Sequence, residues 1–301
     1  MGRELSIIIP VYNKEKYIKK CLDSIKYISN IDYEILVIND GSTDNSQKEI
    51  EKISKENKKV KVFEKKNGGA GSARNLGLLN AEGRYIWFVD SDDLIVAEEF
   101  EQFFKNVKIN NLDIGFGNYN IFYNEDEIIK KEINKEKRLE KIPIIDGKRY
   151  FSITEKYKLS NMIVCKNIYK REFLLKEKIL WPENMIFEDE VFYYLTLNRA
   201  QRVKYIDNDI YLYRQNVENS VMTKSEEKIK DYFKVAYFLG KEVITHKTNR
   251  KMKNIPFKFY IRALKKIKIR DYEIEKTLFK IHGLYFEKIR RKIEILYYGR
   301  N

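Results

Sequence analysis

The chain of 301 residues is 43% hydrophobic and 14% aromatic, so it can bury a core of ordinary size and is neither a disordered chain nor a disulfide-stapled miniprotein. Two cysteines exclude a disulfide framework, and two histidines exclude a histidine-rich metal site before His246, where any bound metal must use oxygen ligands. The net charge of +14 is uneven, because residues 247–301 carry 17 Lys and Arg against 5 Asp and Glu.

Over the first hundred residues, short apolar runs alternate with segments in which apolar residues recur every three or four positions. Strands are predicted over 5–11, 33–38, 60–63 and 85–89. Helices are predicted over 17–28, 44–55 and 70–81, and Asp44 with Gln47 predicts a capping box at the start of the second. This alternation predicts an α/β fold, a mainly parallel sheet with helices on both faces.

The pattern after residue 100 is less regular. A helix is predicted near 99–110, a strand near 114–123 and an exposed loop or hairpin over 124–141, and apolar residues at helical spacing predict a helical, basic region from 224 onward. No apolar run approaches the roughly 18 residues of a membrane span, and no signal-peptide pattern precedes the first strand. We therefore expect a cytoplasmic protein.

Polar residues follow three of the predicted strands at the point where each strand ends. Tyr12 and Asn13 follow the first, Asp40 follows the second, and Asp90 and Asp92 follow the fourth. Because ligands bind beyond the carboxyl ends of the strands in sheets of this kind, these side chains predict a binding site at one sheet edge.

The segment Asp90–Asp93 (DSDD) is the strongest of these signals. Carboxylates at positions i and i+2, where a strand gives way to a turn, can reach one divalent cation together with the ribose or diphosphate of a nucleotide. The alternative is helix capping, in which Asp92 or Asp93 caps a helix that enters at Val96.

Two further segments can contact a nucleotide. Asp40 can accept a hydrogen bond from the imide N–H of uracil, or it can belong to a turn closed by an Asx bond. The glycines of Asn67–Asn75 (NGGAGSARN) precede a helix and allow a ligand to approach the backbone, and Arg74 can reach a base or phosphate. This loop matches neither the dinucleotide fingerprint nor the P-loop, which disfavours dehydrogenases and ATPases.

Four segments follow one another along the chain: Ser6–Asn13 (SIIIPVYN), Glu34–Asp44 (EILVINDGSTD), Asn67–Asn75 and Gly83–Asp93 (GRYIWFVDSDD). Their order and spacing resemble those of inverting family 2 glycosyltransferases, of the kind that builds bacterial polysaccharides on a GT-A fold. The resemblance covers residues 5 to about 110. It implies a GT-A catalytic domain over 1–223, with a nucleotide-sugar part at 1–110 and an acceptor-side part at 111–223, before a helical basic region at 224–301.

The resemblance also implies a UDP-sugar donor and a divalent cation, Mn²⁺ or Mg²⁺. Asp92 is expected to hold the metal, with Asp90 beside it near the ribose or diphosphate, and Ser91 is expected at the same donor site. The residues expected around the nucleoside are Pro10, Val11, Tyr12, Glu15, Asp40, Gly69 and Arg74.

A second block, Phe187–Glu190 with Tyr211–Arg214 and Ser220–Met222, is similar to the acceptor-side region of these enzymes. The resemblance implies that Asp189 is the catalytic base, because an acceptor hydroxyl must lose its proton as it attacks the anomeric carbon. Glu188 is the rival base. The alternative is an acidic first turn stabilised by the helix dipole. Arg214 can reach the diphosphate or orient the acceptor, or it can hold a structural ion pair.

The basic tail at 247–301 interleaves its cations with aromatic residues, a mixture that suits an amphipathic helix on an anionic membrane surface. The alternative is a solvated helical face packed on the catalytic domain. No nucleic-acid-binding motif accompanies the charge, so nucleic acid is not an expected partner. Peripheral attachment to the inner face of the cell membrane would suit a lipid-linked acceptor.

These observations together predict a metal-dependent inverting glycosyltransferase that moves a hexose or N-acetylhexosamine from a UDP-sugar to a hydroxyl of a bacterial surface glycan such as a capsule. One alternative is a nucleotidyltransferase that makes sugar nucleotides, but Pro10–Lys14 does not provide the glycine-rich signature of that class. The other is a non-catalytic basic module that binds a membrane.

Overall fold

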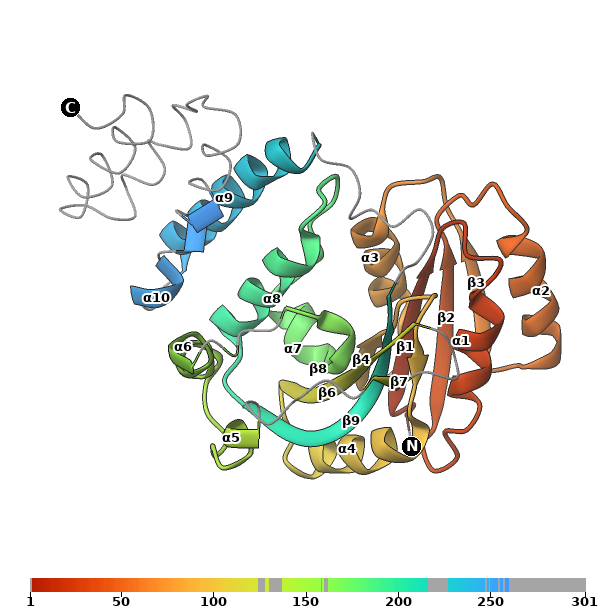
Figure 1. Ribbon diagram of the computed structural model, residues 1–301, viewed down its shortest axis with the longest axis horizontal. Helices are drawn as coiled ribbons and strands as arrows, with labels where there is room; N and C mark the ends of the chain where they lie inside the picture. Colours follow the sequence, from red (N-terminus) through yellow and green to blue (C-terminus); the bar gives the residue numbers. More distant parts are fainter. Residues whose placement is uncertain are drawn as a thin grey trace.

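A computed structural model of the chain describes residues 2–123, 128–129, 137–157, 159, 162–215, 227–246, 248, 250–253, 255–256 and 258–259. These described residues form a nine-stranded sheet flanked by helices (Figure 1). The strand order is β3-β2-β1-β4-β8-β6-β9-β5, and β7 pairs with β6. The α/β fold predicted from the sequence is confirmed.

The first 88 residues of the chain alternate strands and helices as predicted. Its parallel strands are β1 (Leu5–Val11), β2 (Tyr33–Asn39), β3 (Val60–Glu64) and β4 (Tyr85–Phe88). The helices between them are α1 (Ile18–Ile25), α2 (Ser46–Glu56) and α3 (Ala70–Asn80). Every residue of β1, β2 and β4 is buried, as expected of strands covered on both faces.

Residues 94–214 add parallel and antiparallel strands to the same sheet. This part of the chain contains β5 (Leu94–Ile95), α4 (Ala97–Ile109), β6 (Ile114–Phe122), β7 (Ile128–Ile129), α5 (Lys137–Glu140), α6 (Gly147–Tyr157), a 3₁₀ turn (Val164–Lys166), β8 (Asn167–Lys170), α7 (Arg171–Lys176), α8 (Glu188–Arg199) and β9 (Val203–Arg214). β8 runs antiparallel to both β4 and β6, whereas β6 and β9 are parallel. The mainly parallel sheet that we predicted therefore describes β1 to β4, because the strand–helix alternation that enforces parallel pairing stops after β4.

The sheet divides the core into two layers, because successive side chains of a strand point to opposite faces. Ile7 and Ile9 of β1 pack with residues of α1, α2 and α4, whereas Ile8 packs with residues of α3, α6 and α8. Gly77 lets α3 approach the sheet closely, since a Cβ there would stand 2.4 Å from Ile8 Cγ2. This contact holds α3, with Arg74 in its first turn, over the carboxyl ends of the strands.

The described part of the C-terminal region packs on α8 through α9 (Glu227–Thr245), which is followed by α10 (Arg250–Lys253) (Figure 1). Arg199 of α8 donates from Nε and Nη2 to the carboxylate of Glu242 in α9, at 3.1 and 2.7 Å. The ring of Tyr232 stacks on Phe187 with centroids 4.7 Å apart. Residues 260–301, which carry most of the basic tail, lie outside the described residues.

Within the described ranges, no helix is both long enough and apolar enough to cross a bilayer.

One local prediction about α2 is wrong. The helix begins at Ser46, and the side chain of its N-cap residue, Asn45, makes no capping hydrogen bond. Gln47 Oε1 accepts from Asn39 Nδ2 at 2.7 Å, so Asp44 and Gln47 do not form a capping box. The two carboxylate oxygens of Asp44 instead accept hydrogen bonds from the backbone N–H groups of Ser46 and Glu15, at 2.9 and 3.1 Å. Asp44 therefore ties the start of α2 to the loop after β1.

Candidate active site

The acids of the DSDD segment lie where β4 ends, and each has a different set of partners. The Asp90 Oδ1 accepts a hydrogen bond from Arg74 Nη2 at 2.8 Å, and its Oδ2 accepts one from Cys165 Sγ at 3.1 Å. Burial alone would raise the pKa of Asp90, but the Arg74 guanidinium, together with Cys165 and Lys14, outweighs burial and lowers it. Asp90 is thereby held as a carboxylate beside α3.

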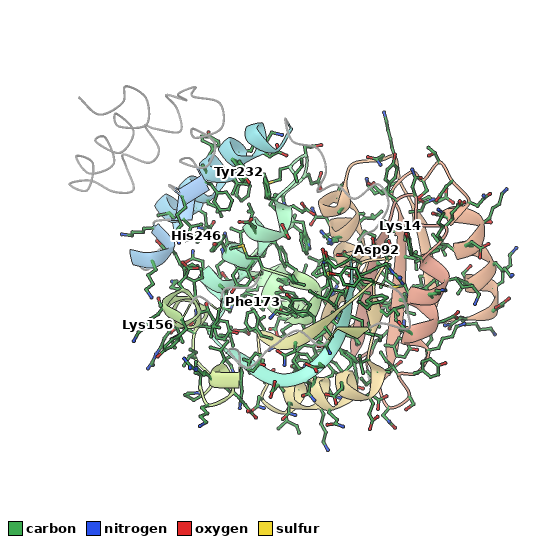
Figure 2. All side chains as sticks on the ribbon, in the orientation of Figure 1. Lys14, Asp92, Lys156, Phe173, Tyr232 and His246 are labelled. Atoms are coloured by element: carbon green, nitrogen blue, oxygen red, sulfur yellow. The ribbon has the colours of Figure 1, made fainter. Side chains whose placement is uncertain are left out.

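Asp92 is paired with a lysine from the loop after β1. Lys14 Nζ donates to Asp92 Oδ2 at 2.6 Å, and Figure 2 shows the two side chains together beside the first strands. Both side chains keep some exposure, 20% for Lys14 and 17% for Asp92. The backbone carbonyl of Asp92 also accepts a hydrogen bond from Arg214 Nε at 2.7 Å. Asp92 is therefore an accessible carboxylate that already attracts a cation.

Asp93 joins β9 to this segment and does not cap a helix. Its Oδ2 accepts from the Tyr211 hydroxyl at 2.6 Å and its Oδ1 from the Arg214 backbone N–H at 2.7 Å. Burial, followed by the neighbouring Asp92 and Asp90, raises the pKa of Asp93 well above its usual range. β5 follows directly and α4 begins only at Ala97, so the helix-capping alternative for Asp92 and Asp93 is wrong. Ser91, between the acids, is buried.

Asp40, after β2, holds the glycine loop in place. Its carboxylate accepts hydrogen bonds from Lys65 Nζ and from the backbone N–H groups of Gly68 and Gly69, at 2.6, 3.0 and 2.8 Å. Gly69 has φ +85°, a left-handed conformation that side chains disfavour, so glycine is needed at this turn. The Asx bond of the β2 turn is made by Asn39, whose Oδ1 accepts from the Ser42 N–H at 3.0 Å.

Arg74 connects the donor-side acids to the second acidic block. Besides Asp90, it pairs with Glu188 through Nη1 and Oε1 at 3.0 Å, and its guanidinium lies over the ring of Trp181 at 4.3 Å. Burial works against its charge, but Asp90 and then Glu188 raise the pKa of Arg74 above its usual value. Arg74 is 6% exposed, so this is a buried cation shared by two carboxylates.

Glu188 and Asp189 open α8, where Phe187 is the N-cap residue. Burial raises the pKa of Glu188 to about 7, although Arg74 opposes the shift. Burial also raises the pKa of Asp189, whose Oδ1 accepts from the Glu190 backbone N–H at 2.8 Å. The two residues thus form an acidic first turn, as the alternative expected, and this turn also lies beside Arg74.

The remaining predicted donor residues line the loop after β1. Pro10 and Val11 are the last, buried residues of β1, whereas the Tyr12 side chain beyond them is 48% exposed. Glu15 does not face the DSDD acids, because its Oε2 accepts from the N–H and Nδ2 of Asn45 at 2.8 and 2.9 Å. Tyr12 is therefore the large side chain that β1 leaves open at this edge.

Arg214, at the end of β9, reaches the same edge. Its guanidinium lies over the rings of Phe122 and Tyr17, at 4.3 and 5.1 Å, and Nε donates to the Asp92 carbonyl. Within the described residues no carboxylate pairs with Arg214, so the structural ion pair expected as an alternative is not formed there. The cation is positioned by aromatic rings and by one backbone oxygen.

Several residues of this network had no predicted role. They are Lys14, Lys65, Cys165, Trp181 and Tyr211, and each contacts a predicted site residue. Lys14 directly follows the segment Ser6–Asn13, and Tyr211 belongs to the segment Tyr211–Arg214. Their nearness to these two segments is the signal that could have identified them. Cys165, Trp181 and Lys65 lie in segments whose pattern gives no sign of the contact.

The site thus combines cation-paired carboxylates at the sheet edge with a buried acidic turn at the start of α8. The family model described as Glycosyl transferase family 2 matches residues 6–176 of the chain. The chain therefore belongs to this family, and the predicted family membership is confirmed.

Relatives among known proteins agree with that membership. The chain is 32% identical over 214 residues to the uncharacterized glycosyltransferase EpsJ of Bacillus subtilis. This match covers 70% of this chain and 61% of EpsJ. It is 32% identical over 217 residues to the poly(ribitol-phosphate) beta-glucosyltransferase of Bacillus spizizenii. This match covers 69% of this chain and 32% of that enzyme. The chain therefore spans less than two thirds of the length of either relative.

Solved structures share the fold. Residues 1–349 of S. aureus TarS, crystallised in complex with UDP-GlcNAc, match with a TM-score of 0.69 at 21% identity, over 97% of this chain and 83% of that chain. The mannosyltransferase PcManGT of Pyrobaculum calidifontis, in complex with GDP-Man and Mn²⁺, matches with a TM-score of 0.56 at 14% identity. That match covers 99% of this chain and 85% of PcManGT. The predicted GT-A fold is confirmed by these likenesses.

Proposed function

We propose that this chain transfers a hexose or N-acetylhexosamine from a UDP-sugar to a hydroxyl of a bacterial surface glycan, with inversion at the anomeric carbon. The observation that carries the proposal is the Arg74 bridge, which brings Asp90 of the donor edge and Glu188 of the acidic turn to one guanidinium. In this proposal the donor-binding and the proton-accepting carboxylates would lie on the two sides of one side chain.

Asp189 is the proposed catalytic base. Inversion in one step needs a carboxylate that takes the proton of the acceptor hydroxyl as its oxygen attacks. Glu188 is tied to Arg74, whereas Asp189 pairs with no cation within the described part of the chain. Burial raises the pKa of Asp189, which makes its carboxylate a stronger base. Glu188 then serves to position Arg74.

The donor edge fits a divalent cation only when the nucleotide supplies most of the ligands. Among the described residues no group of three or more His, Cys, Asp or Glu side chains could hold a metal alone. Asp92 offers an accessible carboxylate that already attracts the Lys14 ammonium, and Asp90 lies two residues before it. Asp92, with Asp90 near it, would hold Mn²⁺ or Mg²⁺, which would offset the charge that develops on the departing diphosphate.

Several other chain residues would bind the donor. The exposed Tyr12 ring can stack on a base. The Asp40 carboxylate already accepts three hydrogen bonds, and since a carboxylate has about four acceptor positions, one is left for a donor of the base. Arg214, without a carboxylate partner among the described residues, is free to bind a diphosphate. The TarS complexes with UDP-GlcNAc and UDP support a uridine donor, and the poly(ribitol-phosphate) relative supports a surface-glycan acceptor.

We also propose that the acceptor is lipid-linked and that the basic tail holds the chain at the inner face of the membrane. The support is the excess of cations at 247–301, each of which contributes on the order of 1 kcal/mol near an anionic surface. The full chain should sediment with phosphatidylglycerol vesicles but not with phosphatidylcholine vesicles. Retention that is equal on both would contradict an electrostatic attachment.

The experiment that tests the activity is a screen of donors with the full chain and Mn²⁺ or Mg²⁺. Hydrolysis of a UDP-sugar to UDP, faster than that of the matching GDP-sugar, is the expected result. Release of pyrophosphate from UTP and a sugar phosphate would instead identify a nucleotidyltransferase. Isothermal titration that shows no heat for UDP with Mn²⁺ would contradict the proposed donor site.

A further inference from the structure

An open cavity of about 770 Å³ lies at the amino ends of β1 and β4, opposite the carboxyl ends that carry the candidate active site. It is formed by the residues before β1, the turn from α3 into β4, Lys108 of α4, and α7. Tyr85, the first residue of β4, lines it, and Asp90 follows five residues later along the chain. At roughly 3.3 Å per residue that separation is about 16 Å, so this cavity is distinct from the candidate active site.

The acidic residues that line the cavity are already neutralised. Each of the three glutamates has a cation within 4.0 Å. The pairs are Glu4 with Lys108, Glu82 with Arg3 and Lys61, and Glu172 with Lys170. The acids therefore do not neutralise the other cations of the lining.

Three cations of the lining remain: Arg84, Arg171 and Lys176. Within the described residues, none of them has a carboxylate within 4.0 Å; Arg84 donates from Nη2 to the Asn111 side chain at 3.0 Å. Three formal positive charges thus face one cavity without a counterion from the described chain, which favours an anionic occupant.

Buried donors at the same cavity also lack partners. The Tyr85 hydroxyl, the Arg3 Nε and the Arg171 Nε are three of the ten buried side-chain polar atoms in the described residues that have no hydrogen-bond partner. All three residues line the cavity, and of the three only Tyr85 is completely buried. A buried polar group without a partner is costly, so these donors would gain hydrogen bonds if a ligand rich in acceptor oxygens entered the cavity and the lining side chains moved to expose them.

From these two observations we propose that the cavity binds the phosphate group of a phosphorylated ligand. A phosphate monoester carries about −1.5 to −2 charges and three acceptor oxygens, which matches several cations and unpaired donors better than a carboxylate does. Guanidinium groups also match phosphate geometry through paired N–H donors. The volume exceeds that of a phosphate alone, and Leu175 with the lysine and arginine stems can contact the rest of the ligand. The source is a soluble phosphoester or a lipid headgroup.

The test uses the full chain and sn-glycerol 3-phosphate as the probe, titrated by calorimetry with and without saturating UDP and Mg²⁺. Binding is expected in both conditions with the same affinity. Arg171→Gln should weaken it about tenfold or more, since charge-assisted hydrogen bonds are the strong ones. Lys52→Gln removes an exposed cation on α2, away from the cavity, and should leave the affinity unchanged.

Tyr85→Phe separates a ligand contact from a structural role. Because the hydroxyl has no partner in the structure, its removal should not lower the melting temperature. It should nevertheless reduce the affinity for the probe several-fold. No binding by the wild-type chain, or equal binding by the wild type, Arg171→Gln and Tyr85→Phe, would overturn the proposal. If UDP failed to bind while Arg171→Gln still weakened the probe, the proposed function would fail and this site would stand.

The two sources of the phosphate are distinguished with vesicles. If the ligand is a lipid, Arg171→Gln should reduce retention on phosphatidic acid vesicles relative to Lys52→Gln. If it is a soluble phosphoester, the two variants should be retained equally while only Arg171→Gln loses affinity for the probe.

Discussion

The acids on the two sides of Arg74 differ in their partners. On the donor side Asp40, Asp90 and Asp92 each contact a cationic side chain, whereas on the α8 side Asp189 contacts none among the described residues. The pKa values of Asp90 and of the α8 acids also differ, since that of Asp90 is lowered by Arg74 while burial raises those of Glu188 and Asp189. Asp90 is thereby kept ionised, whereas Glu188 and Asp189 are buried without full compensation.

The largest effect is expected at Asp189. Asp189→Asn removes the proton acceptor but keeps the shape of the side chain, so turnover should fall roughly a hundred-fold to ten-thousand-fold. UDP binding, measured by calorimetry, should be unchanged because the donor side is intact. Glu190→Gln is the matched control in the same turn. An Asp189→Asn enzyme with full activity would show that the comparison assigns the base wrongly.

The second effect concerns the cation that joins the two sides. Arg74→Met leaves Asp90 and Glu188 without their shared guanidinium, and removal of one partner from a buried ion pair costs about 3 kcal/mol. The free energy of unfolding in urea should fall by about that amount. Adding Glu188→Gln to Arg74→Met should recover part of the loss. An equal or larger loss in the double variant would mean that the bridge does not couple the two acids.

Glu188 should also make stability depend on pH. Its pKa rises from the ordinary value near 4.5 to about 7 on folding, so the folded chain binds the proton more tightly than the unfolded chain does. Its contribution to stability is therefore present below pH 4.5 and is lost as pH rises toward 7, with a slope of at most about 1.4 kcal/mol per pH unit. Urea unfolding between pH 5 and 8 should show a smaller decline for Glu188→Gln. The same decline in both proteins would contradict the raised pKa.

The smallest effect is expected at Lys14. Its ammonium competes with a divalent cation for Asp92, so Lys14→Met should raise Mn²⁺ affinity several-fold in the presence of UDP. Electron paramagnetic resonance of free Mn²⁺ measures this without any turnover. Lys52→Met, which alters an exposed lysine of α2, should behave as the wild type. Weaker Mn²⁺ binding by Lys14→Met would mean that Lys14 supports the metal site.

The predictions from sequence succeeded where the signal is local. Asp40, Asp90 and Asp92 follow strands, and parallel strands bring their carboxyl ends to one edge, so their common location follows from the pattern of β1 to β4. The acidic turn at Glu188 was also predicted. Boundaries of β1, α3 and β6 agree with the structure to within one residue.

Contacts between distant segments could not be predicted. Arg74 and Glu188 are separated by 114 positions and Asp93 and Tyr211 by 118, and no periodicity within either segment records these pairs. The capping box did not form because its second member, Gln47, accepts a hydrogen bond from Asn39 at the end of β2, a tertiary contact that competes with the local motif. No strand was predicted at β8, and its antiparallel pairing escaped prediction for a similar reason, since pairing direction depends on how the chain returns to the sheet.

Asp93 carries a practical consequence for anyone who maps this protein by random mutagenesis. Its carboxyl group anchors β9 through the Tyr211 hydroxyl and the Arg214 amide. A screen that scores loss of function would rank it with its two acidic neighbours, although its replacement would deplete the soluble protein itself. Expression level therefore has to be recorded alongside activity before any member of that tetrapeptide is assigned a chemical task.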